Sequence, residues 1–166
     1  MKAWLKRQWR KCVTGAGIVA VAIAAIFAVQ PDVELVQSPE FRILSNTRLM
    51  LTAPYAVTTD VGVVYMAAGY VSDGASIPHE AWTALGLHPF SGCVVRSALT
   101  HDSLVQGELT DMDTANRVFH DLLIADGVQA DKARTMYNAV CLAGPAVWKR
   151  HTPESKAVAR RFVSLR

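Results

Sequence analysis

The chain has 166 residues, of which 51% are hydrophobic and 19% charged, and its formal net charge is +3. This length suits a single domain of ordinary size. The charge is unevenly distributed, because residues 32–148 hold 6 Lys/Arg and 13 Asp/Glu, a net charge of −7, whereas both ends of the chain are basic. An acidic body argues against nucleic acid as a partner.

Residues 12–30 form a run of nineteen residues without a charged side chain, and the basic segment 1–11 precedes it. As a helix this run would be about 28 Å long, close to the roughly 30 Å of a bilayer's hydrocarbon core. We therefore expect a single-pass transmembrane anchor with a cytoplasmic N-terminus and a periplasmic domain. A cleaved signal peptide is the alternative, but the run exceeds the usual length and Gln30-Pro31 would make a poor cleavage site.

The first half of the body has the pattern of short strands. Residues 41–71 are rich in Val, Leu, Thr and Tyr, and several runs alternate between apolar and polar side chains. The segment Thr59-Asp60-Val61-Gly62 suits a hairpin turn between two of these runs. We expect one small antiparallel sheet of about three or four strands.

Helical patterns dominate the second half. Ser76 can cap, and Pro78 can begin, a short helix that ends before Gly86. Strands followed by helices predict an α+β class: a small antiparallel sheet, then three to four helices, with an N-terminal transmembrane helix. The α+β domain should span residues 32–150, and residues 151–166 should form a basic C-terminal helix or tail. Apolar periodicity places the other helices at about residues 92–105, 111–125 and 130–142.

The helix predicted over residues 111–125 has the clearest pattern. Thr110, followed three residues later by Asp113, resembles a helix start. Asp113, Asn116 and His120 fall together on a polar face beside the apolar stripe, where they can line a cleft. The stripe consists of Met112, Ala115, Phe119 and Leu122.

His101 and Asp102 are adjacent within a mostly apolar helical pattern, where burying either side chain requires a partner. Grouped with Asp73 and with Asn116 or Asp113, they offer the mixed nitrogen and oxygen ligands that suit zinc or manganese. We predict His101, Asp102 and Asp73 as ligands of one divalent ion, with one carboxylate free to act as a general base. Alternatively, the cluster only fastens the sheet to the helices through hydrogen bonds.

The remaining cysteines and histidines give weaker signals. Cys12 lies at the cytoplasmic edge of the predicted anchor, while Cys93 and Cys141 fall in apolar helical patterns. Free buried thiols are therefore favoured over a Cys93–Cys141 disulfide. We expect three histidines to face solvent: His79, His88 and His151.

Four segments together resemble the "domain of unknown function 1353" family of phages and prophages, over about residues 42–150. They are GYVSDGASIP from residue 69, ALTHDSLV from residue 98, DTANRVF from residue 113, and KARTMYNAVCLAGPAVW from residue 132. The resemblance implies that Asp73, Ser76, His101 and Asp102 are the polar residues shared within the family. The chain departs from the family's usual pattern at Asn116, where an aspartate is usual, so that one charge is missing from the predicted site.

The family's role is uncharacterised, but a phage or prophage protein with an exported domain would act at the host envelope. One hypothesis is a metal-dependent hydrolase acting there, for example on peptidoglycan, with Asp73 as ligand or base and Asn116 positioning the substrate. The alternative is a non-enzymatic envelope or virion interaction protein, such as an exclusion factor that binds an envelope protein. An all-helical HD phosphohydrolase conflicts with the strands at 41–71, and Ser76 lacks the GxSxG elbow of a serine hydrolase.

Overall fold

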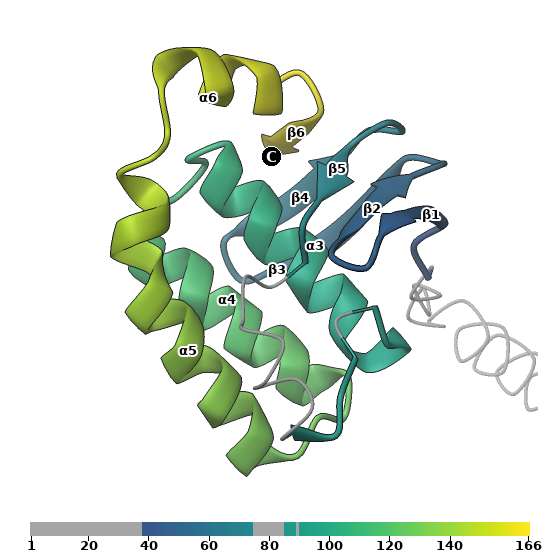
Figure 1. The fold of residues 1–166 in the computed structure, drawn as a ribbon, viewed down its shortest axis with the longest axis vertical. Coiled ribbons are helices and arrows are strands. Elements are labelled where there is room, and N and C mark those ends of the chain that lie inside the picture. The colour runs from purple at the N-terminus through teal and green to yellow at the C-terminus, as the bar shows by residue number, and fades with distance from the viewer. Residues whose placement is uncertain (1–37, 75–84, 89) are drawn as a thin grey trace, which may run out of the picture. The chain divides into compact units, whose positions relative to one another are not determined.

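The computed structural model describes residues 38–74, 85–88 and 90–166. Ser38–Arg166 form one compact unit in which strands come first and helices follow, so the α+β class is confirmed (Figure 1). The elements are β1 (Phe41–Ser45), β2 (Arg48–Leu51), β3 (Tyr55–Thr59), β4 (Gly62–Met66), β5 (Val71–Ser72), α3 (Gly92–Gln106), α4 (Met112–Ala125), α5 (Ala130–Trp148), α6 (Pro153–Ala159) and β6 (Val163–Leu165).

The strands form two small antiparallel sheets where the sequence predicts one. One sheet has the order β1-β2-β5 and the other has the order β3-β4-β6. The hairpin between β3 and β4 lies where it is predicted, with Thr59 opposite Gly62. Gly62 has a φ of +126°, a conformation that other residues rarely adopt, and its carbonyl accepts a hydrogen bond of 2.7 Å from the Thr59 hydroxyl.

The second sheet is completed by the C-terminus of the chain. The predicted C-terminal helix is α6, but the residues after it form strand β6, which pairs with β4 so that Val163 lies opposite Met66. Val163 is buried against the core. The segment between β2 and β3 contains Pro54, which lacks a backbone donor, and these two consecutive strands belong to different sheets.

Helices α3, α4 and α5 confirm the three longer helices predicted from the sequence, with two differences in their bounds. Helix α4 is capped by Asp111 rather than Thr110, since the Asp111 Oδ1 accepts a 2.8 Å hydrogen bond from the Thr114 amide. Helix α5 continues through Gly144 and Pro145 to Trp148. Gly144 lies against Met112, where an added Cβ would come within 3.1 Å of the sulfur, so close packing of α5 on α4 uses the glycine.

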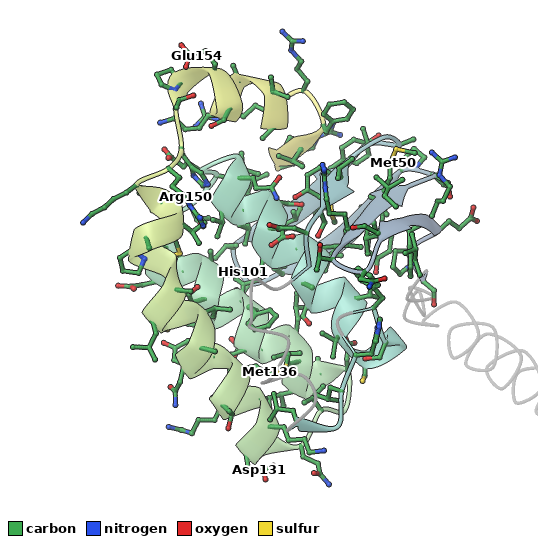
Figure 2. All side chains as sticks on the ribbon, viewed as in Figure 1. Met50, His101, Asp131, Met136, Arg150 and Glu154 are labelled. Carbon is green, nitrogen blue, oxygen red and sulfur yellow. The ribbon has the colours of Figure 1, made fainter. Side chains whose placement is uncertain are left out.

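Two hydrophobic clusters hold these elements together on either side of α3. The first joins the inner faces of both sheets to α3, and Leu49, Val64 and Leu99 are among its fully buried members. The second joins α3 to α4 and α5 through Phe119 and Met136; the latter lies on α5 in Figure 2. Helix α3 is therefore covered by protein on nearly every side.

Several of the sequence predictions concern residues outside the described ranges. The proposed anchor at residues 12–30 and the short helix that begins near Ser76 both belong to these parts of the chain. None of the helices in the described part is both long enough and apolar enough to cross a membrane. The anchor therefore stays a prediction.

Neighbouring residues on α4 provide a test of this packing. Leu123 is fully buried in the second cluster, whereas Ile124 is 42% exposed. Leu123→Ala should lower the free energy of unfolding by about 2–5 kcal/mol, because it removes buried methyl groups and leaves a cavity. Ile124→Ala, the matched control, should change it by less than about 1 kcal/mol. Urea denaturation measures both, and equal losses would contradict the orientation of α4.

Candidate functional site

The candidate site begins with the unusual composition of α3, whose residues 97–105 are all buried although five of the nine are polar. The three hydroxyl groups are satisfied inside the helix: Ser97, Thr100 and Ser103 each donate a hydrogen bond to a carbonyl three or four residues earlier. The side chains of His101 and Asp102 have no such partner in their own helix. They must be satisfied by other elements.

Asp102 is bonded to the end of the first sheet. The hydroxyl of Ser72, the last residue of β5, donates a short hydrogen bond to Asp102 Oδ2. The same Ser72 oxygen accepts a 2.9 Å hydrogen bond from the Gly74 amide, which fixes the turn after β5. Gly74 has a φ of +73°. The turn places Asp73 at the surface, where its side chain is exposed.

The two carboxyl groups have very different surroundings. Burial raises the pKa of Asp102 well above its usual range, and the negative charge of Asp73 raises it further, while the hydrogen bond from Ser72 opposes the shift. Asp102 therefore holds a proton under conditions in which an exposed carboxyl group has lost it. One buried acid beside one exposed carboxylate is an arrangement suited to proton transfer.

His101 is bonded to the helices on its other side. Its Nε2 lies 2.8 Å from Asn116 Oδ1 on α4, and the Asn116 amide nitrogen donates to the sulfur of Cys141 on α5 at 3.4 Å. This network assigns the ring proton to Nε2, which leaves a lone pair on Nδ1. Nδ1 is buried and has no hydrogen-bond partner among the described residues. Burial lowers the pKa of His101, so its neutral form is favoured.

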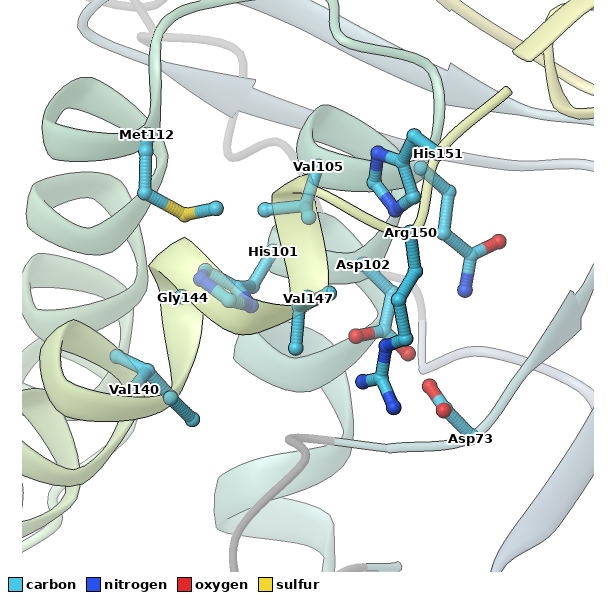
Figure 3. A pocket seen from close by; sticks show the side chains of 12 residues that line it. Asp73, His101, Asp102, Val105, Met112, Val140, Gly144, Val147, Arg150 and His151 are labelled. Carbon is cyan, nitrogen blue, oxygen red and sulfur yellow. The ribbon is translucent and has the colours of Figure 1, made fainter. Parts of the chain in front are cut away.

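Asp73, His101 and Asp102 all line one pocket of about 200 Å³ (Figure 3). Apolar side chains of α4 and α5 form much of its wall, including Met112, Val140 and Val147. The side chains of Arg150 and His151 also line it, just after the end of α5. In Figure 3, His101 lies on the side of Met112 and Val140, and Arg150 lies on the side of the two aspartates.

The structure thus brings together three of the four predicted site residues, and the fourth supports them from behind. Asn116 does not line the pocket but holds His101 through its side chain. Asp113 and His120 instead line a separate open groove with Arg117, Arg134 and Tyr137. The reason is geometric: at about 100° per residue, Asp113 and His120 point in nearly the same direction, while Asn116 is rotated by about 60° toward α3.

Arg150 was not among the predicted site residues, and the prediction that His151 faces solvent is wrong. The His151 side chain is only 13% exposed, and its Nδ1 lies 3.5 Å from the Glu108 carboxylate. The sequence does carry a signal for this arrangement, because Val140, Gly144, Val147 and His151 follow at helical spacing and all line the pocket. His88 is exposed as predicted, and His79 and Ser76 lie outside the described residues.

The thiols and the metal-ligand prediction have separate outcomes. Cys93 and Cys141 are free, as predicted, but both are half-buried rather than fully buried. In residues 38–74, 85–88 and 90–166, no three His, Cys, Asp or Glu side chains are grouped so that they could hold a metal ion. The zinc or manganese site of His101, Asp102 and Asp73 therefore stays a prediction, and its ligands would have to move together to form it.

Comparison with known proteins agrees with the motifs. The family model described as "Protein of unknown function (DUF1353)" matches residues 49–140. The chain belongs to the DUF1353 family. The matched region includes Asp73, His101, Asp102 and Asn116, whereas Arg150 and His151 lie beyond it.

Two curated relatives come from Sinorhizobium fredii (strain NBRC 101917 / NGR234), and both are described as uncharacterized. Protein y4jT is 36% identical over 73 residues, which are 44% of this chain and 21% of the relative. Protein y4iH is 32% identical over 88 residues, or 53% of this chain and 36% of the relative. The similarity to this chain thus spans about a fifth to a third of the length of these relatives. No solved structure matches the chain.

The raised pKa of Asp102 predicts how stability depends on pH. In the unfolded chain this group ionises near pH 4, whereas in the folded protein it keeps its proton to higher pH. Its contribution to stability is therefore fully present below about pH 4 and declines as pH rises toward the folded-state pKa. Asp102→Asn mimics the protonated acid, so it should raise Tm at pH 8 by at least about 3 °C, with no gain at pH 4.

The control for this measurement is Asp121→Asn, since Asp121 is 59% exposed on α4. This variant should show no gain that grows with pH. Because each variant is compared with the natural chain at the same pH, the titration of His101 cancels from the difference. If the Tm of Asp102→Asn and the Tm of the natural protein change in parallel from pH 4 to 8, Asp102 is ionised in the folded protein.

Proposed function

We propose that this DUF1353 chain is a hydrolase facing the cell envelope and that Asp73, His101 and Asp102 are its catalytic residues. The observation that carries the proposal is the buried Asp102 carboxyl, whose pKa is raised by burial and which lines a pocket beside the exposed Asp73. A carboxyl group with a raised pKa can donate a proton to a leaving group, as general acid catalysis requires. Two carboxyl groups in contrasting environments supply the acid and base assignments.

The proposed reaction adds water across one bond of the substrate. The oxygen of the attacking water forms the new bond while the lone pair of His101 Nδ1 accepts its proton. Asp102 gives its own proton to the atom that leaves as the old bond breaks. Asp73, which is exposed beside Asp102, can then pass protons between the pocket and solvent and restore both groups. Asn116 holds His101 in the required tautomer and so positions the base rather than the substrate.

A divalent ion would extend this chemistry. Zinc or manganese held by His101, Asp102 and Asp73 would polarise the attacked bond and acidify a bound water. The acid–base proposal does not require the ion. The three side chains, as the structure places them, are not grouped so that they could hold a metal ion. Mass spectrometry of the purified full chain separates the two versions. About one ion per chain, lost in His101→Ala and in Asp102→Ala, would establish the metal-dependent version.

The second candidate is an envelope or virion interaction protein whose His-Asp cluster is structural. A specific observation favours it: Ser72–Asp102 joins β5 to α3, and His101–Asn116 joins α3 to α4. Such bonds fasten elements together whether or not a substrate binds. Under this candidate, Asp102→Ala and His101→Ala would lower Tm without abolishing any activity, and the partner would be an envelope protein.

We further propose that residues 12–30 anchor the chain in the membrane, with residues 1–11 in the cytoplasm and the domain of residues 32–150 in the periplasm. The proposal is supported by nineteen residues without charge that follow a basic segment. This placement would give the pocket access to peptidoglycan. It also joins the family's phage and prophage context to a site of action at the host envelope.

Hydrolysis can be tested on purified peptidoglycan sacculi. The full chain should release soluble fragments, measured by liquid chromatography, and Asp102→Asn or Asp73→Asn should lower the rate by about 10²- to 10⁴-fold, because each removes a proton-transfer group. Asp113→Asn, an identical change in the separate groove, is the matched control and should keep the natural rate. Absence of release by the natural chain, or full activity of Asp102→Asn, would favour the interaction protein.

The anchor makes a prediction about topology. In cells that express the full chain, the protein should remain in the membrane fraction after carbonate extraction, and proteinase K added to spheroplasts should degrade its C-terminal domain. Deletion of residues 12–30 should leave the domain protected in the cytoplasm, because the export signal is gone. Immunoblotting with a C-terminal tag measures both. A domain that resists the protease in spheroplasts of the natural protein would contradict the periplasmic placement.

A further inference from the structure

The catalytic pocket contains charges of both signs that are not paired with each other. Arg150 lines the pocket together with Asp73 and Asp102, yet its guanidinium forms no ion pair within 4.0 Å to any carboxylate of the described residues. Figure 3 shows the Arg150 side chain on the same side of the pocket as the two aspartates. A space between opposite charges in a shared pocket can be filled by a polar ligand.

The segment after α5 that carries Arg150 is held in place by its own contacts. The backbone continues beyond α5 as a tight turn, in which the Arg150 amide bonds to the Val147 carbonyl at 3.0 Å. Glu108 holds this part of the chain through a 3.0 Å bond to Lys156, and its carboxylate lies 3.5 Å from His151 Nδ1. Glu108 has a φ of +42°, a left-handed conformation usual for glycine, and its side chain fastens the C-terminal segment to the end of α3.

A second and independent observation indicates that the pocket receives a ligand. His101 is only 7% exposed, and its Nδ1 has no hydrogen-bond partner among the described residues although the ring lines the pocket. An unpaired buried acceptor is unfavourable unless something fills it. A donor bound in the pocket, such as the attacking water of the proposed reaction, would satisfy this acceptor, and the carboxylate of Asp73 would accept from an N–H or O–H group of the ligand.

We infer that the pocket takes a small molecule that carries an oxyanion and, a few bonds away, an N–H or O–H donor. Arg150 would bind the oxyanion, with His151 beside it, and Asp73 would accept from the donor, while His101 Nδ1 would accept from the attacking water. The C-terminal end of a short peptide has this chemistry, and so does a small phosphate ester. The inference names the substrate class of the hydrolase proposed above and rests on that proposal for its catalytic meaning.

The pocket's size and wall limit the ligand further. A volume of about 200 Å³ lies below the usual range for drug-sized ligands, so the part that enters must be small. The wall formed by Met112, Val140 and Val147 offers an apolar surface for a short aliphatic side chain. A peptide end with alanine-sized residues fits these limits, and a larger polymer would place only its terminus inside.

Binding to the full chain in detergent can be measured by calorimetry with three probes: N-acetyl-D-alanyl-D-alanine, its C-terminal amide, and inorganic phosphate. The free acid should bind at least about tenfold more tightly than the amide, because an Arg–oxyanion bond is charge-assisted. Arg150→Gln should weaken binding of the acid by at least about tenfold. Lys149→Gln is the matched control, since Lys149 is the exposed neighbour that does not line the pocket.

Each outcome decides between the alternatives. Phosphate binding that depends on Arg150, without binding of the peptide acid, would assign the oxyanion to a phosphate ester and keep the inference. Three results would overturn it. The acid and the amide could bind with equal affinity, or Arg150→Gln and Lys149→Gln could lose the same affinity. The third result is that no probe binds at about 10 mM, roughly ten times the upper end of usual substrate concentrations. Arg150-dependent binding without hydrolysis would overturn the proposed function alone.

Discussion

The hydrogen bond that Ser72 donates to the buried Asp102 connects the end of a sheet strand to the middle of the central helix. Both partners lie inside the protein, so an ionised carboxylate there would lose several kcal/mol of hydration. The neutral acid avoids this loss and accepts from Ser72. Because the Ser72 oxygen also accepts from the Gly74 amide, the same network fixes the turn that exposes Asp73. One buried group thus controls a protonation state and the position of a second carboxylate.

A second network, from His101 through Asn116 to Cys141, connects the three long helices. Asparagine at position 116 bonds to His101 without adding a charge to this network. An aspartate there would favour the charged imidazolium of His101. Asparagine accepts from Nε2 and donates to the thiol without adding charge, so it suits a neutral histidine whose Nδ1 can accept a proton. Asparagine at this position is therefore compatible with a general base at His101.

Local sequence patterns were sufficient for the long helices, the hairpin at Thr59–Gly62 and the grouping of Asp73 with His101 and Asp102. They failed where packing between distant segments decides the structure. The helix predicted over residues 130–142 stops before Gly144, yet α5 continues because this glycine packs on Met112. Likewise, β6 forms because β4 offers it a free edge, and nothing local to residues 163–165 indicates this pairing. Arg150 was missed for the same reason, since it enters the pocket only when α5 is extended.

A structural role and a functional role for the His101–Asp102 cluster can be compared by the observations that each one explains. Fastening the sheet to the helices accounts for the bonds of Asp102 and of His101 Nε2, although apolar side chains of similar volume often serve that purpose equally well. It does not account for a buried histidine nitrogen without a partner among the described residues, nor for a buried acid with a raised pKa that borders a pocket. Features that reduce stability without a structural gain are typical of functional sites, where chemistry requires them. The pocket of Asp73, His101 and Asp102 combines both features on helix α3, beside the turn after β5.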